Sequence, residues 1–296
     1  MAFVATLIAN PDRPAITPEI LIEASRRLRA VSEPAILAHG IAADIRFEAE
    51  RPSAAETDLR EALAGAGLDV VVQREENRRK RLFLADMDST MIGQECIDEL
   101  ADLVGLKAGV AAITERAMRG EIAFEPALRE RVALLKGLPV GVVERLLDER
   151  IKPTPGATTL VATMKANGAY TCLVSGGFTA FTGPVGARIG FDEDRGNVLL
   201  HDNGTFTGFV SEPILGREAK LATLVDLRER LRIGQGDSMA VGDGANDLSM
   251  LRGAGIGVAF RAKPAVAAAS HARIDHGDLT ALLYMQGYRR DEFVAA

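Results

Sequence analysis

Residues 81–90 read Arg-Leu-Phe-Leu-Ala-Asp-Met-Asp-Ser-Thr, and they predict a buried strand that ends in two carboxylates. The apolar run from Leu82 to Ala85 is long enough for such a strand. Asp86 and Asp88 follow it, and residues two apart on an extended chain point the same way. At about 4 Å two carboxylates repel each other by roughly 4 kcal/mol for an effective dielectric of about 20. The pair therefore favours a bound cation or proton, although a polar turn after a strand is the simpler alternative.

The 296-residue chain is long enough for two domains, and its composition, 47% hydrophobic and 26% charged, is typical of soluble globular proteins. A formal net charge of −6 argues against nucleic acid or an anionic membrane as the main partner. No apolar run approaches the ~18 residues that span a bilayer, and the N-terminus lacks the features of a signal peptide. Cys96 and Cys172 show no close pairing or metal-site spacing, so we expect buried thiols and a cytoplasmic location.

Residues 1–78 predict a small α+β domain with the order βαββαβ. Strands are expected at 2–9, 35–38, 42–49 and 68–73, and helices at 17–30 and 53–64. We expect Thr17 to cap the first helix, and Ser53 with Glu56 to form a capping box on the second. The unit resembles ACT domains in topology and size only, because it carries no cluster of reactive side chains. The polar run 74–80 suggests a linker and places the domain boundary near residue 78.

Residues 79–296 predict an α/β core that is interrupted by helices. After the strand at 82–85, helical patterns occupy residues 92–103, 107–118, 124–135 and 140–149. No strand pattern separates them, so we expect a helical cap insertion over about residues 92–155. Beyond it strands and helices alternate, which predicts a doubly wound parallel sheet with helices on both faces. Asp202-Asn203-Gly204 predicts a hairpin turn within this half of the chain.

Three polar clusters each follow a predicted strand, and the carboxyl ends of parallel strands are where such sheets bind ligands. The clusters are Asp86 with Asp88, Ser175-Gly176-Gly177, and the run Gly242-Asp243-Gly244-Ala245-Asn246-Asp247. The carboxylates are hard oxygen ligands suited to Mg²⁺, and the serine and glycines can cradle an anion. Lys220, in a helix expected over 216–231, adds a mobile positive charge. Together these groups meet the needs of phosphoryl transfer to an aspartate.

The four elements stand in the order of the four motifs of the haloacid dehalogenase superfamily, which the chain resembles from about residue 80 to 285. A finer resemblance lies in the helical insertion, at residues 92–101, at Met118-Arg119-Gly120, at Phe124 and at residues 131–135. These segments are similar to those of the branch that hydrolyses O-phosphoserine. The resemblance implies a Mg²⁺-dependent phosphatase with a small-molecule substrate.

The resemblance also implies the role of each motif residue. Asp86 would be the nucleophile that forms an aspartyl-phosphate, and Asp88 would protonate the leaving hydroxyl and then activate water. Mg²⁺ would be held by Asp86, the backbone carbonyl of Asp88 and Asp243, with Asp247 behind them. Ser175, Gly176, Gly177 and Lys220 would bind the phosphate, and Asn246 would lie near it. Glu95 and Arg131 would bind the amino and carboxylate groups of the substrate, and Phe124 would wall the pocket.

Simpler explanations exist for single residues and for the function. Glu95 and Lys220 could be solvated helix residues, Arg131 a surface ion pair, and Ser175 to Gly177 only a turn. A related phosphatase or phosphotransferase would share most of these features. So would a non-catalytic regulator in which Asp86 only accepts phosphate. The first 78 residues could bind serine, form a homodimer or stabilise the core, and the sequence leaves these choices open.

Overall fold

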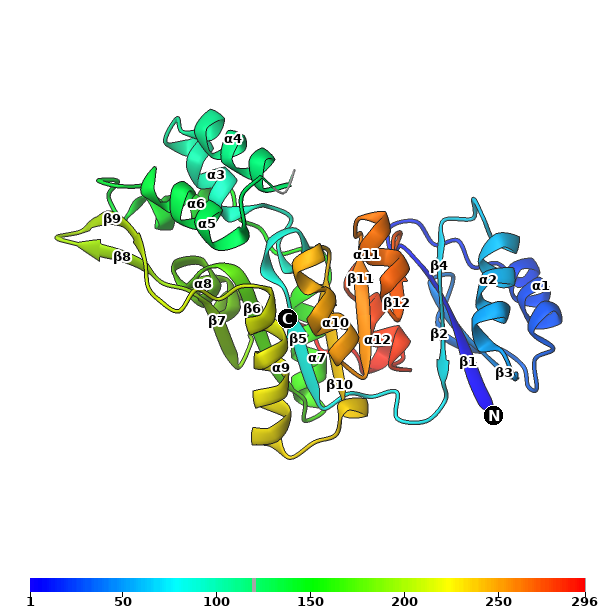
Figure 1. Ribbon diagram of the computed structural model, residues 1–296. Helices are drawn as coiled ribbons and strands as arrows, with labels where there is room; N and C mark the ends of the chain where they lie inside the picture. The colour runs from blue at the N-terminus through cyan, green and yellow to red at the C-terminus, as the bar shows by residue number, and fades with distance from the viewer. Residues whose placement is uncertain (119–120, 296) are drawn as a thin grey trace.

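A computed structural model describes residues 1–118 and 121–295, in which a four-stranded sheet, a six-stranded sheet and a two-stranded hairpin occur (Figure 1). The N-terminal sheet has four strands, and two helices accompany it. In chain order the elements are β1 Ala2–Ala9, α1 Pro18–Leu28, β2 Ala35–Ala38, β3 Ala42–Glu48, α2 Pro52–Ala62 and β4 Leu68–Arg74. The strand order is β2-β3-β1-β4, and every pairing is antiparallel. The predicted βαββαβ order is confirmed.

The second sheet has six parallel strands in the order β12-β11-β10-β5-β6-β7. They are β5 Leu82–Ala85, β6 Tyr170–Phe178, β7 Glu193–Asn197, β10 Ser238–Gly242, β11 Ile256–Phe260 and β12 Ala272–Ile274. The helices around it are α7 Ala157–Ala166, α8 Thr179–Ile189, α9 Arg217–Leu231, α10 Leu248–Gly253, α11 Pro264–Ala269 and α12 Ala281–Met285. Leu82 and Leu84 belong to one buried apolar cluster and Phe83 and Ala85 to another, so both faces of β5 are covered. This confirms the predicted doubly wound core.

Within the described residues, four α-helices lie between β5 and α7, namely α3 Cys96–Leu103, α4 Lys107–Met118, α5 Phe124–Ala133 and α6 Val142–Glu149. The segments that enter and leave this block pair with each other at Ile92 and Pro153. A hairpin of β8 Leu199–Asp202 and β9 Thr205–Val210 packs against the same block (Figure 1). There Gly137 N–H donates to Phe206 O at 2.8 Å. The hairpin turn was predicted, but its attachment to the helical block was not.

Two local predictions are wrong at helix starts. The second helix begins at Pro52 rather than at Ser53, and its N-cap, Arg51, makes no side-chain capping bond. Glu56 is 2.7 Å from Arg60 in an ion pair one turn later, so the predicted capping box does not form. The helix expected from residue 92 begins at Cys96, because the chain turns at Ser89 with a φ of 53°. Thr17 does cap α1, accepting a hydrogen bond from Ile20 N–H.

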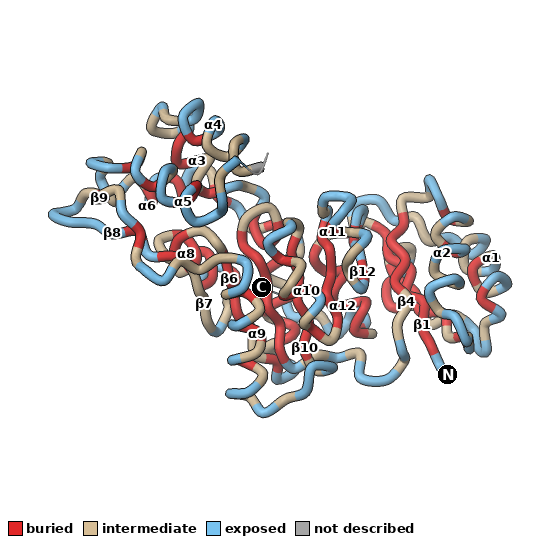
Figure 2. Tube along the Cα trace, viewed as in Figure 1, coloured by how far each residue is buried: buried red, intermediate tan, exposed pale blue. Residues whose placement is uncertain are grey.

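The N-terminal sheet packs on the C-terminal part of the second sheet, and the contact is buried (Figure 2). Ile8 and Val71 share an apolar cluster with Tyr284. The guanidinium of Arg78 lies 2.6 Å from Oδ2 of Asp44 and also donates to the carbonyl of Met285. The domain boundaries near residues 78, 92 and 155 remain predictions, because a packed interface does not by itself divide the chain.

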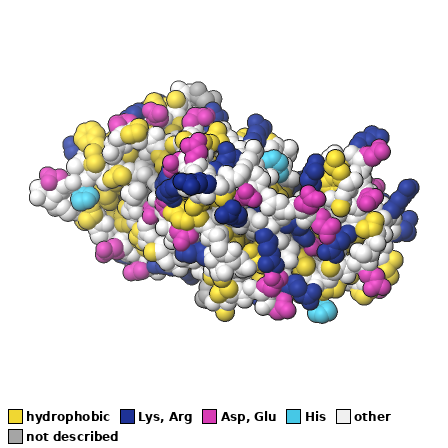
Figure 3. Space-filling view, turned by 90° about the horizontal axis from the view of Figure 1, so that it is seen from below, with side chains coloured by type: hydrophobic (Ala, Val, Ile, Leu, Met, Phe, Trp, Pro, Cys, Tyr) yellow, Lys and Arg dark blue, Asp and Glu magenta, His cyan; other side chains and the backbone are white. Residues whose placement is uncertain are grey.

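The described part of the chain contains no helix long and apolar enough to cross a membrane. On the face seen in Figure 3, acidic and basic side chains are interspersed rather than gathered into a field of one sign. Cys96 and Cys172 are both buried free thiols, as predicted.

Candidate active site

The site lies at the carboxyl ends of β5, β6 and β10, three neighbouring strands of the parallel sheet. Asp86 N–H donates to Val241 O at 3.0 Å, which continues the strand pairing to the first carboxylate. Asp86 and Asp88 both have extended backbone dihedrals, and Met87 between them is fully buried. The two carboxylates therefore both lie just beyond the end of β5.

Lys220 is the cation of the site, and it is buried with 1% of its surface exposed. Its Nζ lies 2.7 Å from Oδ1 of Asp86 and 2.6 Å from Oδ1 of Asp247. Burial would lower the pKa of Lys220, but the two carboxylates raise it above its ordinary value. The prediction of a mobile positive charge is therefore wrong, because two ion pairs hold the ammonium group in place.

Three carboxylates gather beside this lysine. Asp86, Asp243 and Asp247 each offer an oxygen within 4.8 Å of the others, from strand ends β5 and β10. Burial, and then the charge of Asp247, raise the pKa of Asp243 to about 6. Burial also raises the pKa of Asp86, with Asp247 adding to the effect and Lys220 opposing it. One ammonium group does not balance three carboxylates, so the donor set fits a divalent cation with oxygen ligands.

Asp88 is not part of this cluster of three carboxylates, and it lies beside the second motif. Its Oδ1 accepts a hydrogen bond from Cys96 N–H at 3.0 Å. Burial, followed by the charge of Glu95, raises the pKa of Asp88 to about 7. A carboxyl with such a pKa can both donate and accept a proton near neutral pH.

The second motif, Ser175 to Gly177, lies at the end of β6 against Asp88. A Cβ atom at Gly177 would be 3.2 Å from Oδ2 of Asp88 and 3.1 Å from Oγ of Ser175, so glycine leaves room for both side chains. Gly177 N–H donates to Ser175 Oγ at 2.9 Å. The backbone cradle predicted for an anion is thus already partly organised by the serine, which keeps its own hydroxyl proton to donate.

The fourth motif, residues 242–247, depends on two glycines, Gly242 and Gly244. The Asp247 side chain fills the space over Gly242, where a Cβ would lie 2.5 Å from Oδ2 of Asp247. Gly244 N–H donates to the same oxygen at 3.0 Å. Asn246 is exposed, and its side chain lies over Gly244, where a Cβ would collide with it. These contacts aim Asp247 at Lys220 and leave Asn246 at the rim of the site.

The helical insertion reaches the site through Phe124. The ring lies 3.4 Å from the Cβ position of Gly176 and 3.5 Å from that of Gly216. Met118-Arg119-Gly120 is the neighbouring segment singled out by the sequence, and its Arg119 and Gly120 fall outside the described residues. Phe124 keeps 41% of its surface exposed, so it contacts the end of the parallel sheet without being enclosed there.

Glu95 and Arg131 lie on the inserted side of the site. Glu95 is exposed and accepts a hydrogen bond from Ser89 Oγ at 2.6 Å. Arg131 is half-buried, and within residues 1–118 and 121–295 it forms no ion pair. Burial lowers the pKa of Arg131, while the charges of Asp98 and Glu95 oppose this shift. Its Nε donates to Ala127 O at 3.4 Å, and no carboxylate of the described residues pairs with it, which leaves the rest of the guanidinium to an anionic ligand.

Sequence reasoning missed two residues that shape this site. Thr90 is buried and its hydroxyl lies 3.4 Å from Oδ1 of Asp243. Asn197 is buried, and its side chain joins the second motif to the segment before α9. Thr90 comes two residues after Asp88, so its position in the sequence was a usable signal. Asn197 lies far from every motif in sequence, and no local pattern marks it.

Comparison with known proteins places the chain among the haloacid dehalogenase-like hydrolases. The model of that family matches residues 83–252, and the chain belongs to the family. A phosphoserine phosphatase of Albidiferax ferrireducens is 48% identical over 208 residues, which cover 69% of this chain and 88% of the relative. A phosphoserine phosphatase of Archaeoglobus fulgidus is 46% identical, covering 69% of this chain and 60% of the relative.

A solved structure extends the similarity to the N-terminal sheet. A haloacid dehalogenase family hydrolase of Salmonella enterica superposes with a TM-score of 0.87 at 29% identity. The match covers 96% of this chain and 98% of that one. Both sheets and their packing are therefore shared with that hydrolase.

Proposed function

We propose that this chain hydrolyses O-phospho-L-serine to L-serine and phosphate, the last step of phosphorylated serine biosynthesis. The observation that carries the proposal is the contact between the helical insertion and the strand ends at Asp88, whose Oδ1 accepts a hydrogen bond from Cys96 N–H at the start of α3. Asp86, Asp88 and Lys220 gather at the strand ends, and Glu95 and Arg131 belong to the insertion. The first group suits a phosphoryl centre, and the second suits the opposite charges of an amino acid. The phosphoserine phosphatases among the relatives agree with this assignment.

The chain's own groups account for the steps of the reaction. Asp86 is the nucleophile and takes up the phosphoryl group as an aspartyl-phosphate. Asp88, with a pKa of about 7, gives its proton to the leaving serine hydroxyl. The resulting carboxylate then takes a proton from the water that hydrolyses the intermediate. Lys220 with the Ser175 loop stabilises the negative charge of the phosphoryl oxygens.

The cofactor we propose is Mg²⁺. Asp86, the backbone carbonyl of Asp88 and Asp243 would hold it, with Asp247 close behind. When bound, the cation would supply neutralisation of the carboxylates and of the phosphate. Ser175, Gly176, Gly177 and Asn246 would bind the phosphate, and Phe124, whose ring lies 3.4 Å from the Cβ position of Gly176, would wall the pocket. We place the enzyme in the cytoplasm, where the buried thiols Cys96 and Cys172 stay reduced.

Phosphate release is the direct test. The purified chain should release phosphate from phosphoserine with Mg²⁺ and lose that activity when the metal is removed by a chelator. Phosphoethanolamine and glycerol phosphate should be poorer substrates, because neither carries both the ammonium and the carboxylate group of phosphoserine. Phosphothreonine carries both groups, and it should be poorer because its additional methyl group must fit beside them. A preference for one of these would favour the related phosphatase instead. A single burst of phosphate without turnover would favour the phospho-acceptor regulator.

A further inference from the structure

Asn197, the last residue of β7, is 3% exposed and uses its whole side-chain amide on two backbone segments. Its Nδ2 donates to Gly176 O at 2.8 Å and to Leu215 O at 3.1 Å. Its Oδ1 accepts from Leu215 N–H at 2.7 Å. Both amide hydrogens are therefore used, and neither bond goes to a neighbour in sequence.

The two segments held by Asn197 both belong to the site. Gly176 is the middle residue of the phosphate-binding motif. Leu215 precedes Gly216, the N-cap of α9, and α9 carries Lys220 near its start. A Cβ at Gly176 would lie 3.9 Å from Leu215 O, and the Phe124 ring contacts the Cβ positions of both Gly176 and Gly216. One buried amide thus joins the phosphate motif to the helix that carries the catalytic lysine.

The bond to Gly176 O also sets the direction of the next amide. The carbonyl of Gly176 and the N–H of Gly177 belong to one trans peptide, in which they point in opposite directions. With the carbonyl held toward Asn197, the Gly177 N–H points away from it, where it donates to Ser175 Oγ. Glycine stands on both sides of this peptide, so few steric barriers prevent its rotation. A hydrogen bond to its carbonyl is the restraint that backbone sterics do not provide.

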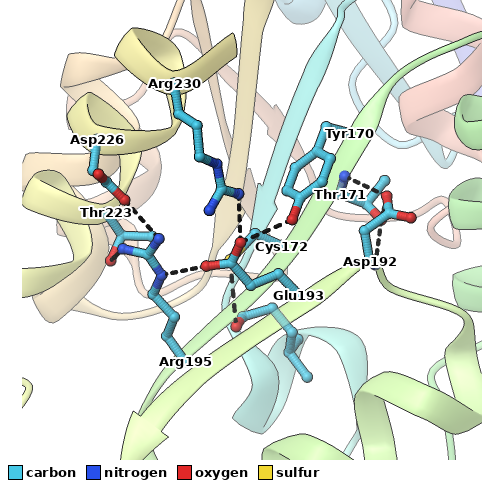
Figure 4. Close-up of polar contacts among 10 residues, drawn as sticks. Tyr170, Thr171, Cys172, Asp192, Glu193, Arg195, Thr223, Asp226 and Arg230 are labelled. Atoms are coloured by element: carbon cyan, nitrogen blue, oxygen red, sulfur yellow. Dashed lines mark hydrogen bonds and ion pairs between the residues drawn. The ribbon is translucent and has the colours of Figure 1, made fainter.

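Asn197 can act in this way because β7 itself is braced (Figure 4). Glu193 in β7 accepts from Tyr170 of β6 at 2.8 Å, and Arg195 in β7 lies 2.6 Å from Asp226 of α9. Burial opposes ionisation of Glu193, but Arg230 and Arg195 hold its pKa at about 2, so its charge persists. These contacts fix β7 between β6 and α9, and Asn197 stands at the end of β7 that reaches the site.

We infer that Asn197 is a positioning residue for phosphate binding, a role that rests on the proposed function. It orients the peptide between Gly176 and Gly177 and holds the start of α9 at a fixed position relative to that peptide. Loss of this amide lets the peptide rotate and breaks the bond from Gly177 N–H to Ser175 Oγ, so the serine hydroxyl loses the partner that orients it for the phosphate. A misplacement of about 1 Å at a reacting centre can cost on the order of 10²-fold in rate.

Two variants test the inference against a matched control. Asn197→Ala removes all three bonds. Asn197→Asp keeps the shape and the acceptor for Leu215 N–H but cannot donate to Gly176 O. Gln286→Ala is the control, because Gln286 is also buried and bonds to backbone, at Lys80 N–H and Leu282 O, beyond the opposite end of β5. If Asn197→Ala does not fold, Asn197→Asp carries the comparison.

The readouts are binding of inorganic phosphate by calorimetry and separate KM and kcat values for phosphoserine. Both Asn197 variants should weaken phosphate binding by about tenfold or more and raise KM in proportion. Gln286→Ala should lower Tm but leave both values within about threefold of wild type. Phosphate binding within threefold of wild type in both Asn197 variants, or an equal loss in Gln286→Ala, would overturn the inference. A wild-type chain that binds phosphate but does not hydrolyse phosphoserine would contradict the proposed function alone.

Discussion

The ammonium nitrogen of Lys220, a residue of α9, lies 2.7 Å from Oδ1 of Asp86, which directly follows the last residue of β5. The side chains of both residues are buried, with 1% and 7% of their surfaces exposed. The ion pair holds the lysine beside the carboxylate that we propose as nucleophile. The same ammonium group also reaches Asp247, so a single cation faces two carboxylates.

Replacing Lys220 should therefore reduce both stability and activity. Lys220→Met leaves Asp86 and Asp247 buried without this partner, a change that costs about 3–5 kcal/mol for buried pairs. Loss of the charge opposite the phosphoryl oxygens should lower kcat by about 10²-fold or more. Thermal unfolding and phosphate release measure the two effects. Lys165→Met is the control, because the Lys165–Asp192 pair is partly exposed and its loss should cost about 1 kcal/mol or less. Equal stability losses would mean that Lys220 is not paired with charged carboxylates.

Asp88→Asn should slow both chemical steps. The amide cannot exchange the proton that Asp88 donates and recovers, yet its oxygen can still accept from Cys96 N–H. General acid–base help is typically worth about 10²–10⁴-fold, so kcat should fall by that factor while Tm stays near wild type. Steady-state kinetics with a melting curve check the prediction. A kcat within threefold of wild type would show that another group is the acid.

Glu95→Gln should move the pH profile of the reaction. The Glu95 charge helps to raise the pKa of Asp88, after burial, to about 7. Removing that charge lowers the pKa, so Asp88 loses its proton at a lower pH. Because the protonated form is the acid for the first step, the alkaline limb of kcat/KM should shift to lower pH. A full pH–rate profile measures the shift, and KM should rise as well. An unmoved or alkaline-shifted limb would contradict the assignment of Asp88 as acid.

Arg131→Ala should discriminate between substrates. A guanidinium is a planar donor fork matched to a carboxylate, and removing one partner of such a buried pair costs about 2–5 kcal/mol. We expect kcat/KM for phosphoserine to fall by roughly two or more orders of magnitude. Phosphoethanolamine lacks the carboxylate, so its low rate should barely change. Arg131→Lys should recover only part of the loss. Proportional losses on both substrates would mean that Arg131 serves folding or phosphate binding.

The interface between the two sheets can be tested at adjacent residues. The Arg78 side chain is 10% exposed and pairs with Asp44, whose side chain is 3% exposed, whereas Arg79 is 46% exposed and pairs with Glu292. Arg78→Met should destabilise the chain by about 3–5 kcal/mol and open the segment near residue 78 to proteolysis. Arg79→Met should cost about 1 kcal/mol or less. Similar melting curves for the two variants would show that the interface does not depend on Arg78.

Most of the architecture could be predicted from local patterns. Apolar runs such as Leu82 to Ala85 must be buried, and the alternation of strands and helices leaves a parallel sheet as the natural way to bury them. The motif residues were located for the same reason, because polar clusters after buried strands meet at one edge of the sheet. Helix starts were less certain. Ser53 and Glu56 have the spacing of a capping box, but Glu56 pairs with Arg60 and the helix begins earlier.

Contacts between distant segments were decided only by the tertiary structure. Lys220 looks like an exposed helix residue in sequence, yet packing of α9 against the sheet buries it between two carboxylates. Asn197 has no motif around it. Its role follows from its hydrogen bonds to Gly176 and Leu215, which come together only in the folded chain. A sequence pattern determines which side chains must leave water, since that depends on their chemistry. Which buried polar groups then satisfy one another depends on how separate elements pack, and no local pattern contains that information.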